Sequence, residues 1–200
     1  MTSPHSVLTK SKLPFSADKT IESGITMSEQ IRFDGFAPPE NKEKSEKNIT
    51  CCFTGHRNIS QNPLLYASVR MEIEKAYALG YRIFCAGGAL GFDSVAALNV
   101  LALRENGYGD IKLHLVLPYP DQHARWSKYD RHTYEEILKR ADSVEYVSEH
   151  YTQWCMHTRN RRLVDLSSYC ICYLNEEGKS GTSYTVGYAQ KKGLHVVNLG

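Results

Sequence analysis

The sequence predicts an α/β protein built on a doubly wound, mainly parallel sheet of about six strands. Short apolar runs rich in β-forming residues alternate with single segments whose apolar residues recur at helical spacing. Glycine-rich turns follow several of these apolar runs. Alternating strands and helices form βαβ units, and right-handed crossovers place the helices on both faces of a parallel sheet.

Each predicted strand is a short apolar run bounded by polar or turn residues. The predicted strands cover residues 49–53, 81–85, 112–117, 143–147, 169–174 and 194–199. Proline at 118 and 120 ends the third run, because proline cannot donate to a sheet ladder. The fifth run, with the loop 175–185 after it, is the stretch around which the predicted site is organised.

The helical segments lie between these runs. The first begins at Pro63, with Asn62 as its N-cap, and Gly80 closes it. The second follows Asp93, and Gly107 ends it. Three more are predicted around residues 137–141 and over 152–166 and 182–192.

Composition bounds the class of protein. A hydrophobic content of 42% and a charged content of 23% are ordinary for a globular chain. No run of about 18 apolar residues is present, and the N-terminus lacks the apolar core of a signal peptide, so neither a membrane span nor a leader is predicted. The six cysteines show no C-x-x-C pair. We therefore predict a reduced, cytoplasmic protein without a metal site.

Two parts of the chain differ in composition. Residues 1–47 are rich in Ser, Thr, Lys and Glu with scattered prolines, a composition that buries too little apolar surface to offset the entropy of ordering. We expect a disordered tail over 1–47 and one folded ligand-binding domain over 48–200. Met27 is an alternative start of the protein.

Three glycine turns predict where a ligand binds. They lie at Gly55, at Gly87-Gly88-Gly91 and at Gly178-Gly181, each after a predicted strand. Carboxyl ends of parallel strands share one edge of the sheet, where such folds bind ligands. Glycine lets backbone amides approach a ligand, and a helix N-terminus adds partial positive charge. The turns together predict a phosphate or nucleotide site.

Polar side chains near these turns have chemistry that suits such a ligand. Arg57 is expected to clamp a phosphate with two hydrogen bonds, and Thr54 and Thr182 offer hydroxyls. Asp93 either stabilises a helix N-terminus or accepts a ribose hydroxyl. The predicted ligand-binding residues are Thr54, Gly55, Arg57, Gly87, Gly88, Asp93, Arg159, Gly181 and Thr182. No catalytic residue is predicted.

Five motifs carry a family resemblance. They are CFTGHR (52–57), GGALGFD (87–93), Pro118 with Gln122, Arg125 and Trp126, RNRRLVDLSS (159–168) and SGTSYTVGYA (180–189). In this order they resemble the YpsA-like branch of the SLOG superfamily, over residues 48–200. The resemblance implies a Rossmann-like fold that binds a nucleotide-derived ligand, in a cytosolic bacterial sensor or regulator.

Two more distant relatives supply alternative functions. The segment 156–159 is similar to part of the motif of LOG-type phosphoribohydrolases, and Gly181-Thr182 matches their Gly-Thr pair, but Thr185 stands where their catalytic glutamate is expected. The DNA-processing protein DprA also shares the fold. An N-glycosidase and a DprA-like single-stranded DNA binder thus remain alternatives.

The predicted partner is a small nucleotide-like ligand, with no further cofactor and no membrane. Nucleic acid is not expected, because no continuous basic stripe extends beyond residues 159–162. A homodimer remains an open alternative.

Deleting residues 1–47 tests the predicted division of the chain. The melting temperature is expected to change by no more than about 2 °C, because a tail with almost no buried area contributes little to the free energy of unfolding. Thermal unfolding followed by circular dichroism measures this. A fall of about 10 °C would show that part of the tail packs on the folded domain.

Overall fold

A computed structural model describes residues 46–59, 63–175 and 178–200. It contains a six-stranded sheet in the order β4-β3-β2-β1-β5-β6, with every pair of neighbouring strands parallel. The strands are β1 (Thr50–Gly55), β2 (Ile83–Ala86), β3 (Lys112–Leu117), β4 (Ser143–Tyr146), β5 (Tyr169–Tyr173) and β6 (His195–Asn198). The predicted doubly wound α/β class is confirmed, and the sheet is parallel throughout.

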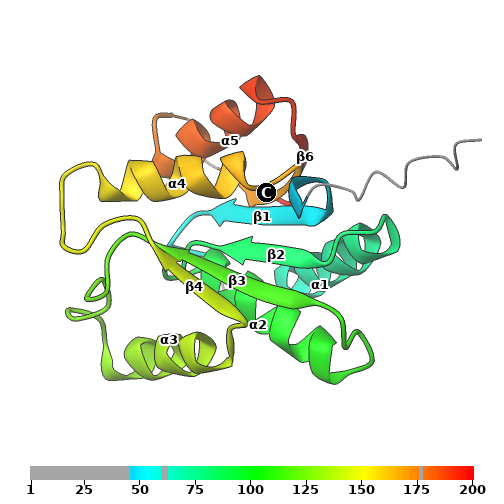
Figure 1. Ribbon diagram of the computed structural model, residues 1–200, viewed down its shortest axis with the longest axis horizontal. Coiled ribbons are helices and arrows are strands. Elements are labelled where there is room, and N and C mark those ends of the chain that lie inside the picture. The colour runs from blue at the N-terminus through cyan, green and yellow to red at the C-terminus, as the bar shows by residue number, and fades with distance from the viewer. Residues whose placement is uncertain (1–45, 60–62, 176–177) are drawn as a thin grey trace, which may run out of the picture. The chain divides into compact units, whose positions relative to one another are not determined.

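Helices cover both faces of the sheet, as Figure 1 shows. The helices are α1 (Pro63–Ala78), α2 (Phe92–Glu105), α3 (Lys128–Arg140), α4 (Cys155–Asp165) and α5 (Gly181–Lys191). Helices α1, α2 and α3 lie on one face, and α4 and α5 lie on the other. The inner strands β1, β2 and β5 are buried along almost their whole length, as parallel strands are when helical layers cover both faces, whereas the residues of the edge strands β4 and β6 are half-buried or exposed.

Two apolar cores flank the sheet, and strand alternation assigns residues to them. In β1, Cys51 and Phe53 belong to the core under α1 and α2, whereas Cys52 belongs to the core under α4 and α5. All six cysteines are free and buried. Burial raises the pKa of the Cys51 thiol well above its ordinary value. A buried free cysteine behaves as a small apolar side chain.

The order of the strands locates the site. From β1 the chain adds β2, β3 and β4 in one direction, and then crosses back to place β5 and β6 on the opposite side of β1. The direction therefore reverses between β1 and β5, whose pairing runs to Gly55 opposite Tyr173 at the carboxyl ends. Open α/β sheets bind ligands in the crevice at this reversal.

The described part of the chain begins slightly before the predicted domain. A short 3-10 helix, η1 (Glu46–Ile49), precedes β1, and the Thr50 hydroxyl donates to the Glu46 carbonyl at 2.6 Å. The predicted boundary after residue 47 therefore falls within this turn. Residues 1–45 and the predicted N-cap Asn62 lie outside the described residues. Within the described ranges, no helix combines the length and apolar character that crossing a membrane requires.

The turn before α2 requires glycine. Gly91 has a φ of +77°, and a Cβ at this position would lie 2.2 Å from the Arg57 carbonyl oxygen. The next residue, Phe92, donates its amide to the His56 carbonyl at 3.1 Å. The close approach of these two backbones joins the end of β1 to the beginning of α2.

Replacing Gly91 with alanine is expected to lower the free energy of unfolding by at least about 2 kcal/mol, because it adds left-handed strain and a clash with backbone. Gly187→Ala is the matched control, since Gly187 lies in α5 with open space at its Cβ. That change is expected to raise stability by about 0.5–1 kcal/mol. Urea unfolding measures both, and equal effects would contradict the assigned role of Gly91.

Candidate ligand-binding site

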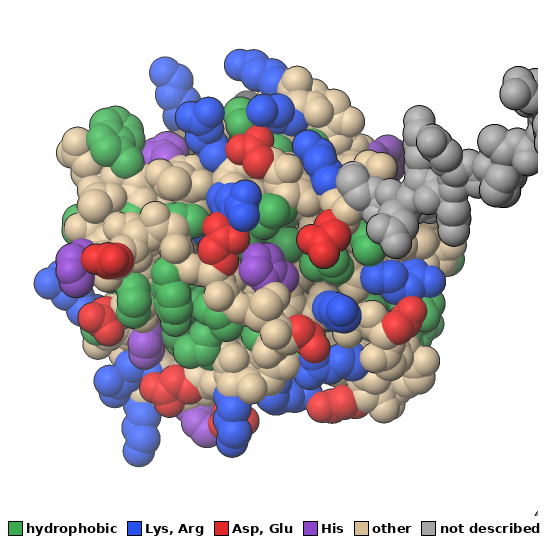
Figure 2. Space-filling view, viewed as in Figure 1, with side chains coloured by type: hydrophobic (Ala, Val, Ile, Leu, Met, Phe, Trp, Pro, Cys, Tyr) green, Lys and Arg blue, Asp and Glu red, His purple; other side chains and the backbone are tan. Residues whose placement is uncertain are grey.

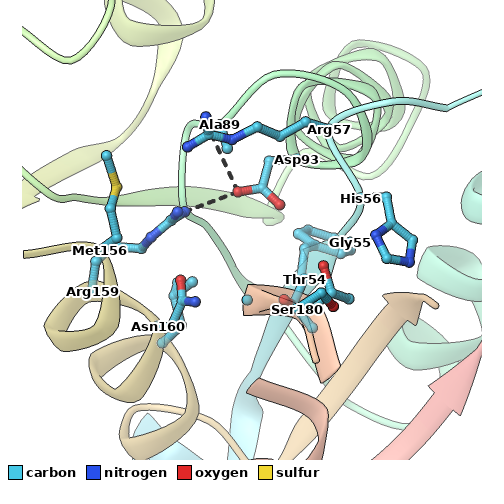
Figure 3. A pocket seen from close by; sticks show the side chains of 14 residues that line it. Thr54, Gly55, His56, Arg57, Ala89, Asp93, Met156, Arg159, Asn160 and Ser180 are labelled. Carbon is cyan, nitrogen blue, oxygen red and sulfur yellow. Dashed lines mark hydrogen bonds and ion pairs between the residues drawn. The ribbon is translucent and has the colours of Figure 1, made fainter. Parts of the chain in front are cut away.

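A pocket of about 250 Å³ opens at the carboxyl end of β1. Its walls come from the end of β1, the beginning of α2, the buried side of α4 and the N-terminus of α5, as Figure 3 shows. The lining residues are Phe53, Thr54, Gly55, His56, Arg57, Ala89, Asp93, Met156, Arg159, Asn160, Leu163, Ser180, Gly181 and Thr182. Segments more than 120 residues apart in sequence thus form one site.

Backbone hydrogen bonds join the loop after β1 to β5 and to α2. The His56 amide donates to the Tyr173 carbonyl at 3.3 Å, and the His56 carbonyl accepts from Phe92. The Phe92 ring stacks on Tyr173, with centroids 5.9 Å apart. Gly55 leaves room for this ring, because a Cβ there would lie 2.5 Å from Phe92. The loop after β1 is therefore held between β5 and α2.

A buried ion pair lies at the centre of the site. Arg159 Nη1 on α4 donates to Asp93 Oδ2 on α2 at 3.0 Å, and the two side chains are only 7% and 5% exposed. The Ala89 amide also donates to this carboxylate oxygen, at 3.3 Å. Figure 3 shows the Arg159 guanidinium reaching toward Asp93, with Arg57 lying over the same carboxylate.

Burial opposes ionisation of both partners. It raises the pKa of the Asp93 carboxyl, while the charge of Arg159 and the Ala89 amide act in the opposite direction. It likewise lowers the pKa of the Arg159 guanidinium, while Asp93 acts to raise it. A buried charge is tolerated where it is paired and hydrogen-bonded, so each of these residues depends on the other.

Two residues that line the pocket each have a buried side-chain nitrogen without a hydrogen-bond partner. Among the described residues, the buried side-chain nitrogens without one are His56 Nε2, His123 Nδ1 and Arg159 Nε. The first and the last belong to residues that line the pocket. Unpaired buried polar groups are costly and rare in native proteins, so these nitrogens indicate a site that a polar ligand completes.

Gly87 and Gly88 lie next to the ion pair and its loop, where a larger residue would not fit. A Cβ on Gly87 would lie 1.4 Å from Arg159 Nη1 and 2.8 Å from Asp93 Oδ2, so the ion pair requires glycine there. Gly88 has a φ of +64°, and its carbonyl accepts from Gln122 Nε2 at 3.1 Å. Gly87 therefore leaves room for the ion pair, and Gly88 joins its loop to Gln122. Neither glycine lines the pocket.

The N-terminus of α5 forms another wall. Ser180 is the N-cap, and it exchanges side-chain to backbone hydrogen bonds with Ser183 in a capping box. The first amides of a helix have no partner within the helix, and those of Gly181 and Thr182 belong to residues that line the pocket. This end of α5 therefore offers amide donors and partial positive charge to an anion.

Seven of the nine predicted site residues line the pocket, and the two that do not are Gly87 and Gly88. Sequence reasoning left His56 and Asn160 out of the site, although each adjoins a predicted residue. Arg162, three residues after Arg159, instead makes two hydrogen bonds to Glu145 on β4, at 2.7 and 3.0 Å. Thr185 is buried and donates its hydroxyl to the Gly181 carbonyl at 2.7 Å.

Metal ligands do not gather in the described part of the chain. No group of three or more His, Cys, Asp and Glu side chains there has an arrangement that could hold a metal ion. Of the described residues that line the pocket, only Asp93 carries a carboxylate, and Arg159 pairs with it. Arg57 is the remaining charged side chain among these lining residues, and the hydroxyl and amide groups of Thr54, Asn160, Ser180 and Thr182 can both donate and accept hydrogen bonds.

The fold and the pocket define a Rossmann-like α/β domain with an anion-suited site where the strand order reverses. The model of the YpsA family, described as the YspA SLOG family, matches residues 52–196. The match covers well over half of the chain, and the chain belongs to this family. The resemblance seen in the sequence motifs is thereby confirmed.

Relatives of similar sequence are UPF0398 proteins. One from Shouchella clausii is 32% identical over 107 residues, which cover 52% of this chain and 56% of that protein. Another from Oceanobacillus iheyensis is 25% identical over 134 residues, or 66% of this chain and 72% of that protein. The chain spans little more than half the length of several of the curated relatives it matches.

A solved structure shares the fold. DNA processing protein A from Helicobacter pylori, described for its single-stranded DNA binding mode, matches with a TM-score of 0.56 and 20% sequence identity. The match covers 76% of this chain and 66% of that protein. At this identity the likeness establishes the fold.

Removing the carboxylate of the ion pair should destabilise the protein strongly. Asp93→Ala is expected to lower the free energy of unfolding by about 3–5 kcal/mol, because it leaves the buried Arg159 charge without its partner. Glu74→Ala removes the matched exposed pair with Arg70 on α1, and a loss below about 1 kcal/mol is expected. Urea unfolding of both variants compares the pairs, and similar losses would contradict a buried, interdependent pair.

Proposed function

We propose that this protein binds a nucleotide-derived ligand through its phosphate and acts as a sensor or regulator. The observation that carries the proposal is the buried Arg159 guanidinium, which is held in the pocket by Asp93 and retains an unpaired Nε donor. An arginine fixed in this way is preorganised for an anion, so little rotamer entropy is lost when the ligand binds.

The charge of the site supports an anionic ligand. Asp93 and Arg159 compensate each other, whereas the exposed Arg57 adds positive charge beside them. The N-terminus of α5 contributes partial positive charge on the opposite wall. A phosphate bound between these groups would accept from backbone amides and from arginine, which is how helix N-termini and arginine forks recognise phosphate.

The size of the pocket supports a compact ligand. Its volume of about 250 Å³ lies just below the range of about 300–1,000 Å³ that is common for small-molecule sites. One nucleotide, or the phosphate and sugar of a larger one, suits this space better than a long polymer does. Thr54 and Asn160 supply further polar groups for a sugar or base.

Two features favour binding over turnover. Thr185 occupies the position that would supply the glutamate of LOG-type phosphoribohydrolases, and its hydroxyl is engaged within α5. Asp93 is paired with Arg159, so its negative charge is already compensated and is poorly available to stabilise a ribosyl cation. An N-glycosidase would need an acid in place of that glutamate, and if free base were released from AMP, Asp93 would be the first residue to mutate.

Single-stranded DNA binding is the second candidate. The shared fold with DNA processing protein A, which is described as binding single-stranded DNA, favours it. Binding to the phosphates of a strand would weaken steeply as salt concentration rises. A small ligand held by one phosphate would show a much smaller dependence on salt.

Arg159→Ala is expected to weaken AMP binding about tenfold to a hundredfold, because a charge-assisted hydrogen bond to phosphate contributes about 1.5–3 kcal/mol. Arg159→Lys retains the charge but loses the planar fork, and it should also bind more weakly. Arg131→Ala, an exposed arginine on α3, is the control and should bind normally. Isothermal titration calorimetry measures all three, with circular dichroism to verify folding.

Three outcomes would contradict the proposal. Failure of the wild-type protein to bind AMP would remove its basis. Release of free base from AMP that Arg159→Ala abolishes would make the protein an enzyme. Tight binding of an oligonucleotide with a steep salt dependence, in the absence of AMP binding, would favour the DNA-binding alternative.

A further inference from the structure

Two further hollows beside α4 and α5 adjoin the pocket. A second hollow, of about 510 Å³, shares Ser180 and Gly181 with the pocket. A third, of about 380 Å³, shares His157 and Tyr184 with the second. Each hollow thus adjoins the next, in a row from the ion pair to Trp154. We call the outer part of this row, lined by Trp154, His157, Arg161 and Tyr184, the aromatic groove.

Aromatic rings line this groove and face solvent. The Trp154 side chain is 63% exposed and Tyr184 is 42% exposed. The His157 ring lies between them, with its centroid 6.1 Å from that of Trp154 and 5.0 Å from that of Tyr184. Exposed aromatic side chains gathered in a hollow are typical of ligand-binding surfaces, because a flat ring buries apolar area when another ring stacks on it.

A supporting layer holds the groove in place. Tyr188 lies parallel to Tyr184 one helical turn further along α5, with ring centroids 6.4 Å apart. Its hydroxyl donates to Asp165 at 2.9 Å, and Lys192 pairs with the same carboxylate at 3.3 Å. These contacts tie α5 to α4 beneath the exposed rings. Tyr184 is thus supported from one side and open on the other.

Positive charge accompanies the rings. The Arg161 guanidinium lies 5.2 Å from the Tyr188 ring centroid, and Lys179 lines the hollow that adjoins the pocket. Figure 2 shows lysine and arginine side chains gathered over α4 and α5 along the upper side of this view. Rings with nearby cations on a groove are the arrangement by which proteins stack bases while attracting phosphates.

We propose that the ligand is a phosphate-linked dinucleotide. The pocket binds one nucleotide with its phosphate, and the base of the second nucleotide stacks on Trp154, His157 and Tyr184. This inference rests on the proposed function, because the phosphate in the pocket places the second ring over the groove. Ser180 and Gly181 line both the pocket and the neighbouring hollow, so a ligand in the pocket lies next to the groove.

Comparing two probes on wild-type protein and variants tests the dinucleotide. The probes are AMP and the dinucleotide pApA, titrated by calorimetry. Wild-type protein is expected to bind pApA about tenfold or more tightly than AMP, because stacking of one base on aromatic rings contributes an effect of this size. Tyr184→Ala should remove this advantage and leave AMP binding unchanged.

Two variants serve as controls. Tyr184→Phe keeps the ring and should bind pApA as the wild type does. Tyr66→Ala removes a tyrosine of the same 42% exposure on α1, on the opposite face of the sheet, and should have no effect. The melting temperatures of all variants show whether a loss of binding comes from loss of fold.

The outcomes separate this inference from the proposed function. If the wild type binds AMP and pApA equally, or if Tyr184→Ala weakens both probes alike, the groove does not hold a second ring and the phosphate site stands. If neither probe binds, the proposed function fails as well. If the oligonucleotide dA12 binds at least tenfold more tightly than pApA, the ligand is a longer strand and the dinucleotide assignment is overturned.

Discussion

The ion pair between Asp93 and Arg159 constrains much of the site around it. It joins α2 to α4, helices that cover opposite faces of the sheet, and its charged atoms meet 3.0 Å apart in the carboxyl edge between them. Two charges that are almost removed from water are stable only when they attract each other and form hydrogen bonds. Gly87 must therefore lack a side chain, and the turn through Gly91 must bring the beginning of α2 against the end of β1.

The same pair explains how a small pocket can be both buried and charged. Asp93 fixes one nitrogen of the Arg159 guanidinium, whereas Arg159 Nε and His56 Nε2, both buried in residues that line the pocket, have no hydrogen-bond partner. Donors held in this way do not need to be ordered when a ligand arrives. Their cost in the empty protein is the cost of unpaired buried groups, which a bound anion would relieve.

Helix α4 contributes to both the pocket and the aromatic groove because of its periodicity. Residues three or four apart lie on one face, so Arg159 shares its buried face with Cys155 and Leu163, which pack toward the sheet. His157 and Arg161, offset by two residues, lie on the exposed side next to α5. Packing of α5 beside this helix then places Gly181 at the pocket and Tyr184 at the groove.

The spacing of apolar and turn residues along the sequence determined the fold class, the order of strands and helices, and the edge of the sheet where the glycine turns meet. Periodicity and turn chemistry are properties of neighbouring residues, so the sequence alone contains them. Most predicted site residues line the pocket because the carboxyl ends of parallel strands must share one edge of the sheet.

Only the tertiary structure decided the role of Asp93, for which the sequence left two roles open. Asp93 pairs with an arginine 66 residues away. The tertiary structure also decided that Gly87 makes room for that pair, and that Arg162 turns to Glu145 instead of the pocket. Burial and pairing depend on which distant segments the sheet brings together, and residue spacing alone does not contain that information.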